Sequence, residues 1–158
     1  MDNNDVEFVL KAHSDMVYKL ALSQTKNQAN AEDIFQDVFI RLMKTDTKFE
    51  NNNHIKAWLI KTTLNCCRSL WSSAWFRRTT SLDENLQTED YINENNLYTK
   101  VMELPKKYRV VIHLFYYEDM SISDIAKSTG LKKETIASQL SRGRNILKQK
   151  LGKDFIYE

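Results

Sequence analysis

The chain has 158 residues, and its 23 Lys and Arg against 21 Asp and Glu give a net charge of +2. This length allows one domain or two small ones, and no apolar run reaches the ~18 residues that a membrane-spanning helix needs. The amino-terminal stretch MDNNDVEF is acidic and has the features of neither a signal nor a transit peptide. We therefore expect a cytoplasmic protein.

The charges are distributed unevenly along the chain. Residues 1–50 carry six basic and nine acidic residues, a net of −3, whereas residues 51–82 carry five basic and no acidic residues, a net of +5. Residues 83–103 carry one basic and six acidic residues, a net of −5, and residues 104–158 carry eleven and six, a net of +5. Two basic blocks around an acidic stretch are typical of a protein that meets a polyanion at two places. Chance clustering is the alternative for blocks this short.

The sequence offers little to support catalysis or metal binding. Cys66 and Cys67 are adjacent, which is a poor arrangement for a structural disulfide. The three histidines lie far apart without ligand spacing, and we find neither a phosphate-cradling glycine loop nor a nucleophile–base pair. We expect no metal, no cofactor, no small-molecule substrate and no enzymatic activity.

Scarce Pro and Gly and the lack of sustained strand-like alternation predict an all-α protein. A first helix is predicted over residues 6–23 by its apolar spacing, and its inward side chains are Phe8, Val9, Ala12, Met16 and Leu20. After a polar turn over residues 24–30, Asn30 is expected to cap a second helix over residues 31–44. The apolar stripe of this helix consists of Ile34, Phe35, Val38, Phe39, Leu42 and Met43. Its opposite side carries Asp33, Gln36, Asp37 and Arg41.

An Asn-rich loop, residues 45–54, leads to a third helix over residues 55–71 that is apolar around most of its circumference. At 100° per residue, Lys61, Asn65 and Arg68 fall within about 60° of one another, and Trp58 lies at their edge. This narrow basic stripe favours contact with a polyanion. An ordinary solvent-exposed strip is the alternative.

Residues 80–96 contain few apolar side chains and many Asn, Asp, Glu and Thr, which predicts a flexible acidic linker. The chain is thus expected to form two small helical domains, residues 1–79 and 97–158. In the second domain Pro105 is expected in the first turn of a helix that runs to Glu118. The inward side chains of that helix are predicted to be Tyr108, Val111, Ile112 and Phe115.

Residues 121–151 predict a helix-turn-helix. Gly130 falls where the first helix must end in a left-handed residue, while Ala126 and Ile136 occupy positions that favour close helix crossing. The second helix has a helical repeat of Ile136, Leu140, Gly143, Leu147 and Leu151. Its other side carries residue types that bind the major groove or phosphates, namely Lys133, Glu134, Thr135, Ser138, Gln139, Arg142 and Arg144. A solvated helical hairpin is the alternative.

Three segments together resemble the extracytoplasmic-function (ECF) group of sigma factors in the sigma-70 family, and the resemblance covers nearly the whole chain. AEDIFQDVFIRLMK is similar to the family's Asp-x-x-Gln helix, which docks on the clamp of RNA polymerase. AWLIKTTLN is similar to the family's promoter-facing helix, and LPKKYRVVIHL precedes the helix-turn-helix. The resemblance implies a sigma factor with two helical domains, one melting the minus-ten element and the other reading the minus-thirty-five element.

The same resemblance implies the partners and their contact residues. Core RNA polymerase, promoter DNA and an anti-sigma factor would be the partners, and polymerase would supply all the catalysis. The polymerase-docking residues would be Asp33, Gln36, Asp37 and Phe39. The loop from Phe49 to His54, including Asn52, would receive a flipped-out base. The melted strand would be held by Lys61, Asn65 and Arg68, and Trp58 at their edge would be a further DNA-binding residue.

Three departures from the family's pattern leave the DNA sequence preference open. Ala137 stands where a basic residue is frequent, and residues 72–74 stand where a more basic run is common. Gly143 replaces a usual alanine at a cost of ~1 kcal/mol in helix propensity. Two other functions stay in view: a helix-turn-helix regulator that acts without replacing sigma, and a helical adaptor or sigma antagonist that does not bind promoter DNA.

Overall fold

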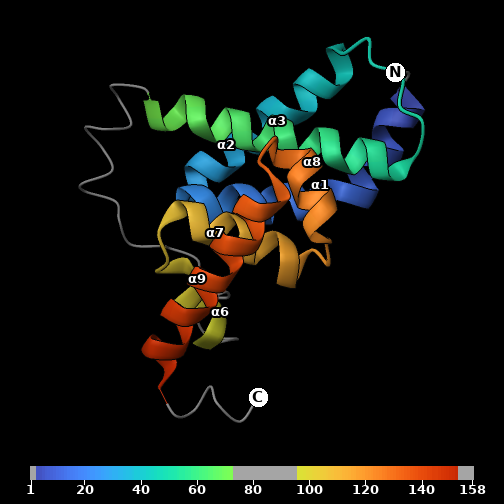
Figure 1. Ribbon diagram of the computed structural model, residues 1–158. Helices are drawn as coiled ribbons and strands as arrows, with labels where there is room; N and C mark the ends of the chain where they lie inside the picture. The colour runs from blue at the N-terminus through green and yellow to red at the C-terminus, as the bar shows by residue number, and fades with distance from the viewer. Residues whose placement is uncertain (1–2, 73–95, 153–158) are drawn as a thin grey trace. The chain divides into compact units, whose positions relative to one another are not determined.

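The computed structural model describes residues 3–72 and 96–152. All regular structure in these ranges is helical, which confirms the all-α prediction. They belong to two compact units, coloured blue to green and yellow to red in Figure 1. The predicted linker lies outside the described residues except for Asn96, which begins a helix. No helix within these ranges has the length and apolarity needed to cross a membrane.

The amino-terminal unit contains three helices. They are α1 (Asn3–Thr25), α2 (Gln28–Lys44) and α3 (Asn52–Ser72). Each of the three packs against the other two. Their shared core is aliphatic, and its largest fully buried side chains are Leu20, Leu22, Leu42, Leu59 and Ile60.

The start of α2 differs from the prediction. Asn27 caps the helix, because its side-chain oxygen accepts a hydrogen bond from the Asn30 amide at 2.8 Å. Asn30 itself is buried within the first turn. Because α1 continues to Thr25, the predicted polar turn over residues 24–30 shrinks to two residues between the helices.

Three side chains predicted to face inward are exposed instead. Phe8 is 69% exposed and Met43 52% exposed, and Ala12 also lies at the surface. At 100° per residue, Phe8 lies about 100° and Ala12 about 60° around α1 from buried Val9. Met43 lies about 140° around α2 from buried Val38. The buried stripes are therefore narrower than the apolar pattern indicated.

The carboxyl-terminal unit is built around its last helix. Its elements are α6 (Asn96–Met102), α7 (Lys106–Ile112), the π-helix η1 (His113–Tyr117), α8 (Ile122–Thr129) and α9 (Lys133–Leu151). The long helix α9 packs against α6, α7 and α8. The core of the carboxyl-terminal unit contains Leu104, Ile112, Leu114, Ile125, Ile136 and Leu140.

The segment from Pro105 to Glu118 is not the single α-helix that was predicted. Pro105 precedes the helix as its N-cap, with extended backbone angles, and α7 gives way to η1 at His113. Tyr108 and Phe115 are only half-buried. A π-helical turn adds a residue to the helical repeat, so side chains beyond His113 are rotated relative to a continuous α-helix.

A buried arginine ties α6 to α7. Arg109 is 3% exposed, and its Nη1 donates hydrogen bonds to the carbonyl oxygens of Met102 at 3.0 Å and Leu104 at 3.1 Å. Burial lowers the pKa of Arg109 to about 10. The guanidinium thus satisfies the Met102 carbonyl, which the end of α6 leaves without an intrahelical partner, and the Leu104 carbonyl in the turn that follows.

The turn of the helix-turn-helix forms as predicted. Ser121 caps α8 by accepting a hydrogen bond from the Asp124 amide at 3.0 Å. Gly130 ends α8 in the left-handed region, at φ +78°, and its amide donates to the Ala126 carbonyl at 2.9 Å. The apolar repeat of α9 is buried at Ile136, Leu140, Gly143 and Leu147.

Replacing Gly130 by alanine should lower the free energy of unfolding by about 1–2 kcal/mol, because a Cβ is disfavoured in left-handed backbone. No atom lies within 4 Å of the position that this Cβ would take, so the loss comes from the backbone alone. Urea unfolding followed by circular dichroism measures it. Gly130→Asn should lose less, since asparagine tolerates this conformation better. An alanine variant as stable as the unsubstituted protein would contradict the assignment.

Candidate polymerase and nucleic-acid interfaces

The solvent-facing side of α2 presents two side chains with no partner in their own unit. Asp33 and Gln36 are exposed one helical turn apart, and within residues 3–72 neither takes part in a hydrogen bond or an ion pair. Residues three apart on a helix are neighbours on its surface. A carboxylate and an amide are thus available side by side for an external partner.

Asp37, the next predicted docking residue, is engaged within the unit. Arg41 donates from Nε to Asp37 Oδ1 at 3.3 Å, and the Cys66 thiol of α3 donates to Oδ2 at 3.3 Å. Burial, reinforced by the hydrogen bond to Asp37, raises the pKa of Cys66 to about 11. The neutral thiol therefore links α3 to α2 and leaves the Asp37 carboxylate less free for outside contacts.

Phe39 lies in the core. It is 5% exposed, and its ring centroid lies 4.8 Å from that of Phe35 on the same helix. This burial agrees with the predicted apolar stripe of α2, to which Phe39 belongs. Within the described amino-terminal unit the side chain is packed inward and supports α2 from inside.

The basic stripe of α3 faces solvent along its length. Lys61, Asn65 and Arg68 are all exposed. Arg68 donates from Nη1 to Asn65 Oδ1 at 3.0 Å, which orients the amide and leaves its nitrogen outward as a donor. Neighbouring positions Leu64 and Cys67 are buried, so the stripe is the polar edge of a helix that otherwise packs inward.

The loop before α3 is held by local hydrogen bonds. Asn51 caps the helix by accepting from the His54 amide at 2.8 Å, and the Glu50 amide donates to His54 Nδ1 at 3.1 Å. The Phe49 ring stands edge-on to His54 and to Trp58, with centroids 5.2 Å and 5.8 Å away. The structure thus brings Phe49 and Trp58 together as one half-buried aromatic cluster.

Asn52 makes a structural contact that was not predicted from the sequence. Its Oδ1 lies 2.8 Å from Nε2 of His13, which is 6% exposed on α1. The contact joins residues 39 apart in the chain. It fixes the start of α3 against α1, while the Asn52 amide nitrogen stays available as a donor.

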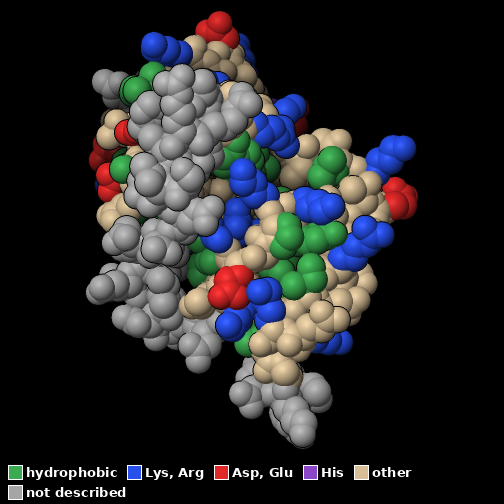
Figure 2. All heavy atoms as spheres, turned by 90° about the vertical axis from the view of Figure 1, so that its left-hand side faces the viewer, with side chains coloured by type: hydrophobic (Ala, Val, Ile, Leu, Met, Phe, Trp, Pro, Cys, Tyr) green, Lys and Arg blue, Asp and Glu red, His purple; other side chains and the backbone are tan. Residues whose placement is uncertain are grey.

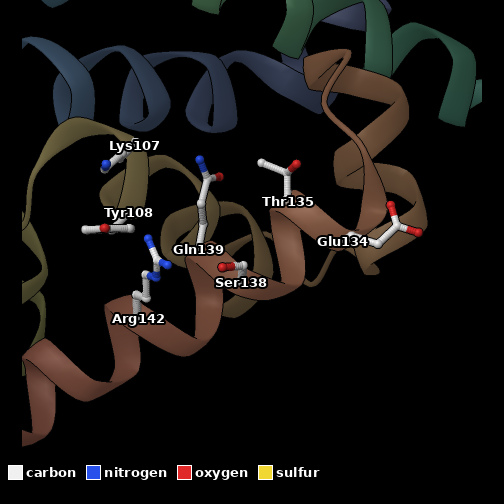
Figure 3. Close-up of a pocket in the computed structure, with 7 residues that line it drawn as sticks. All are labelled: Lys107, Tyr108, Glu134, Thr135, Ser138, Gln139 and Arg142. Carbon is white, nitrogen blue, oxygen red and sulfur yellow. The ribbon is translucent and has the colours of Figure 1, made fainter.

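The polar side of α9 borders a shallow hollow of about 330 Å³. Lys133, Glu134, Ser138 and Arg142 are exposed, whereas Thr135 and Gln139 are half-buried. Figure 3 shows that Lys107 and Tyr108 of α7 form the other side of this hollow. The helix predicted to enter the major groove therefore shares its polar surface with a second helix.

Arg144 is held by an aromatic pair. Its Nε donates to the Tyr116 hydroxyl at 2.6 Å, and its guanidinium carbon lies 5.5 Å from the ring centroids of both Phe115 and Tyr116. Such contacts combine a hydrogen bond with attraction between a cation and an aromatic face. The role of Tyr116, which is 50% exposed, was not predicted, because the contact spans 28 residues of sequence.

Basic side chains recur on the described surface that Figure 2 shows, with fewer acidic ones among them. Two lysines of the carboxyl-terminal unit are partly neutralised, because Glu103 lies 3.2 Å from Lys150 and 3.8 Å from Lys100. Within the described ranges no group of His, Cys, Asp and Glu is arranged to hold a metal ion.

Comparison with known proteins decides the family. The sigma-70 region 2 family model matches residues 9–77, and the sigma-70 region 4 model matches residues 94–147. The chain belongs to the sigma-70 family. It is an RNA polymerase sigma factor that acts in promoter recognition and transcription initiation, as the resemblance predicted.

Relatives of similar length support this assignment. The RNA polymerase sigma factor SigV of Bacillus subtilis is 27% identical over 146 residues, covering 90% of this chain and 88% of SigV. The ECF sigma factor SigW of the same organism is 27% identical over 162 residues, covering 90% and 87%. The solved structure of sigma factor RpoE in complex with the anti-sigma factor NepR from Bartonella quintana shares the fold. It has a TM-score of 0.74 at 22% identity and covers 95% of this chain and 98% of that one.

In this sigma factor, Gly143 lets two region 4 helices approach closely. A Cβ at this position would lie 3.0 Å from Ile112 Cγ1 and 3.5 Å from Tyr108 Cβ of α7. Ile112 is 1% exposed and has little room to move aside. The glycine therefore does more than weaken α9, because its missing side chain sets the distance between α7 and α9.

Replacing Gly143 by alanine should lower the free energy of unfolding. Alanine gains ~1 kcal/mol in helix propensity, but overpacking a tight core typically costs about 1–3 kcal/mol. Urea unfolding decides between the two effects. Ala137→Gly, at an exposed position of the same helix, isolates the propensity term and should cost ~1 kcal/mol. A Gly143→Ala variant stabilised by the full propensity gain would contradict the packing argument.

Proposed function

We propose that the sigma factor docks on core RNA polymerase through the outer side of α2, with Asp33 and Gln36 as the main contacts. Both side chains are exposed and without partners within residues 3–72. Asp37 contributes less directly, since its carboxylate accepts from Arg41 and Cys66. Phe39 acts by packing beneath this surface.

The melted minus-ten strand is proposed to follow the stripe of α3. Lys61 and Arg68 supply positive charge for the backbone, and the oriented amide of Asn65 can bind a base edge. Aromatic rings stack on unpaired bases with little sequence preference, which suits the cluster of Phe49 and Trp58. Asn52, fixed through His13, positions the loop that would accept a flipped base.

The minus-thirty-five element is proposed to bind α9 through its major groove. The face from Lys133 to Arg142 supplies mixed donors and acceptors for base edges. Arg144, held by Tyr116, is placed for a phosphate. The observation that carries the whole proposal is that α2, α3 and α9 each present exposed polar side chains inside the segments matched by region 2 and region 4.

The domain organisation, the cellular location and a further partner are proposed on the same basis. Residues 1–79 and 97–158 would act as separate domains joined by the acidic stretch 80–96. The protein itself would perform no chemistry and would work in the cytoplasm, where core polymerase and promoter DNA are found. An anti-sigma factor is a further proposed partner, since the structurally similar RpoE was solved with one.

In-vitro transcription with core polymerase and this protein alone tests the function. Replacing Asp33 and Gln36 together by alanine should weaken core binding at least about 100-fold, since two central contacts would be lost. Co-elution and run-off transcription measure the effect, and circular dichroism should show unchanged helicity. Glu7→Ala, which removes an exposed acidic side chain from α1, is the matched control. Wild-type co-elution of the double variant would refute the docking assignment.

Arg142→Ala should weaken binding of the holoenzyme to the upstream element by ~1–3 kcal/mol. Loss confined to one base position would indicate base reading, and equal loss on all sequences would indicate a phosphate contact. Affinities for singly substituted promoter duplexes, with footprints, distinguish these outcomes. Lys100→Ala serves as the control, because Lys100 is paired with Glu103 in the same unit. An upstream footprint identical to that of the unsubstituted protein would exclude a DNA role for Arg142.

A further inference from the structure

The hollow beside α9 is shared between two helices. Lys107 and Tyr108 come from the first turn of α7, and Arg142 comes from α9. In Figure 3 the side chains of Tyr108 and Arg142 extend toward one another, with Lys107 on the same side. Close helix packing at Gly143 makes this possible, because the Tyr108 Cβ lies only 3.5 Å from where a residue 143 Cβ would be.

These three side chains interact directly. The Tyr108 hydroxyl oxygen accepts a hydrogen bond from Arg142, and Lys107 Nζ lies 5.1 Å from the centroid of the Tyr108 ring. The hydrogen bond from Arg142, together with the nearby charge of Lys107, lowers the pKa of Tyr108.

The charge of this cluster is not neutralised nearby. Among the described residues, neither Lys107 nor Arg142 forms an ion pair with a carboxylate. Glu134 also lines the hollow, but it is eight residues from Arg142, which is about 12 Å along the helix axis. Figure 3 places it at the opposite end of the hollow from Lys107. The end formed by Lys107, Tyr108 and Arg142 therefore offers an ammonium, a hydroxyl and a guanidinium as donors.

We propose that Lys107, Tyr108 and Arg142 form a binding site for a DNA backbone phosphate, so that α7 contacts the promoter together with α9. Tyr108 acts as a positioning residue that holds the Arg142 guanidinium beside the Lys107 ammonium. The inference rests on the proposed binding of α9 to the minus-thirty-five element and adds a contact from a helix outside the recognition helix. A phosphate is the fitting ligand, since it accepts several hydrogen bonds and carries the charge that the cluster lacks.

The salt dependence of promoter binding tests whether Lys107 contacts a phosphate. The probe is a promoter duplex selected from random DNA by wild-type holoenzyme, and all variants are assayed as holoenzyme. The logarithm of the DNA-binding constant falls linearly with the logarithm of the salt concentration, and removing one phosphate contact should make this slope less negative by about 0.9. The ratio of the wild-type binding constant to that of Lys107→Ala should therefore fall about 3.5-fold between 50 and 200 mM salt. Lys100→Ala should leave the slope unchanged. A Lys107→Ala slope equal to wild type would overturn the proposal.

A double-mutant cycle tests the positioning role. Tyr108→Phe keeps the ring and removes the hydroxyl, and it should weaken binding about 2–12-fold, the value of a hydrogen bond. In the Arg142→Ala background the same change should have less than about a twofold effect, because coupled residues are not additive. Equal effects in both backgrounds would reduce Tyr108 to a packing residue and refute the site. Loss of promoter binding by wild-type holoenzyme itself would instead refute the proposed function.

Discussion

The carboxyl-terminal unit depends on the close packing of α9 against α7 at Gly143. Without a side chain there, Ile112 fills the space directly, and the apolar residues of α9 reach the core. The same approach brings Tyr108 next to Arg142 on the surface. Core packing and the placement of Arg142 beside Tyr108 thus have one cause.

On α2 of the amino-terminal unit, one polar side chain is bonded within the unit and two are exposed without a partner in it. Asp37 faces α3 and is satisfied by Arg41 and the Cys66 thiol, which stays neutral because its pKa is about 11. Asp33 and Gln36 lie on the same helix but have no partner in the unit. Since an unsatisfied buried carboxylate is costly and an exposed one is not, this division keeps the fold stable and leaves two exposed groups, which are the proposed contacts for polymerase.

Local sequence signals predicted the features that are local in origin. Gly130 as the turn residue and the exposed stripe of Lys61, Asn65 and Arg68 follow from backbone preference and helical period. Features that depend on distant contacts were missed. The bond between His13 and Asn52 spans 39 residues, and the exposure of Phe8 depends on how far the partner helices extend over α1. Propensity alone also could not place the cap of α2, because Asn27 and Asn30 are equally good capping residues.

Two arginines that are proposed to bind DNA are each held by a tyrosine of the same unit. A free arginine side chain carries about 2 kcal/mol of rotamer entropy, which is lost when it binds. In this protein Arg142 and Arg144 are both engaged by tyrosines, Tyr108 from α7 and Tyr116 from η1. Each tyrosine restrains its arginine in the free protein, so less entropy would be lost if the arginine bound DNA as proposed. The π-helical turn serves the same end, since it sets the helical phase that directs Tyr116 toward α9. In the proposed DNA complex, the region 4 unit would therefore contribute to affinity by orienting its charges as well as by carrying them.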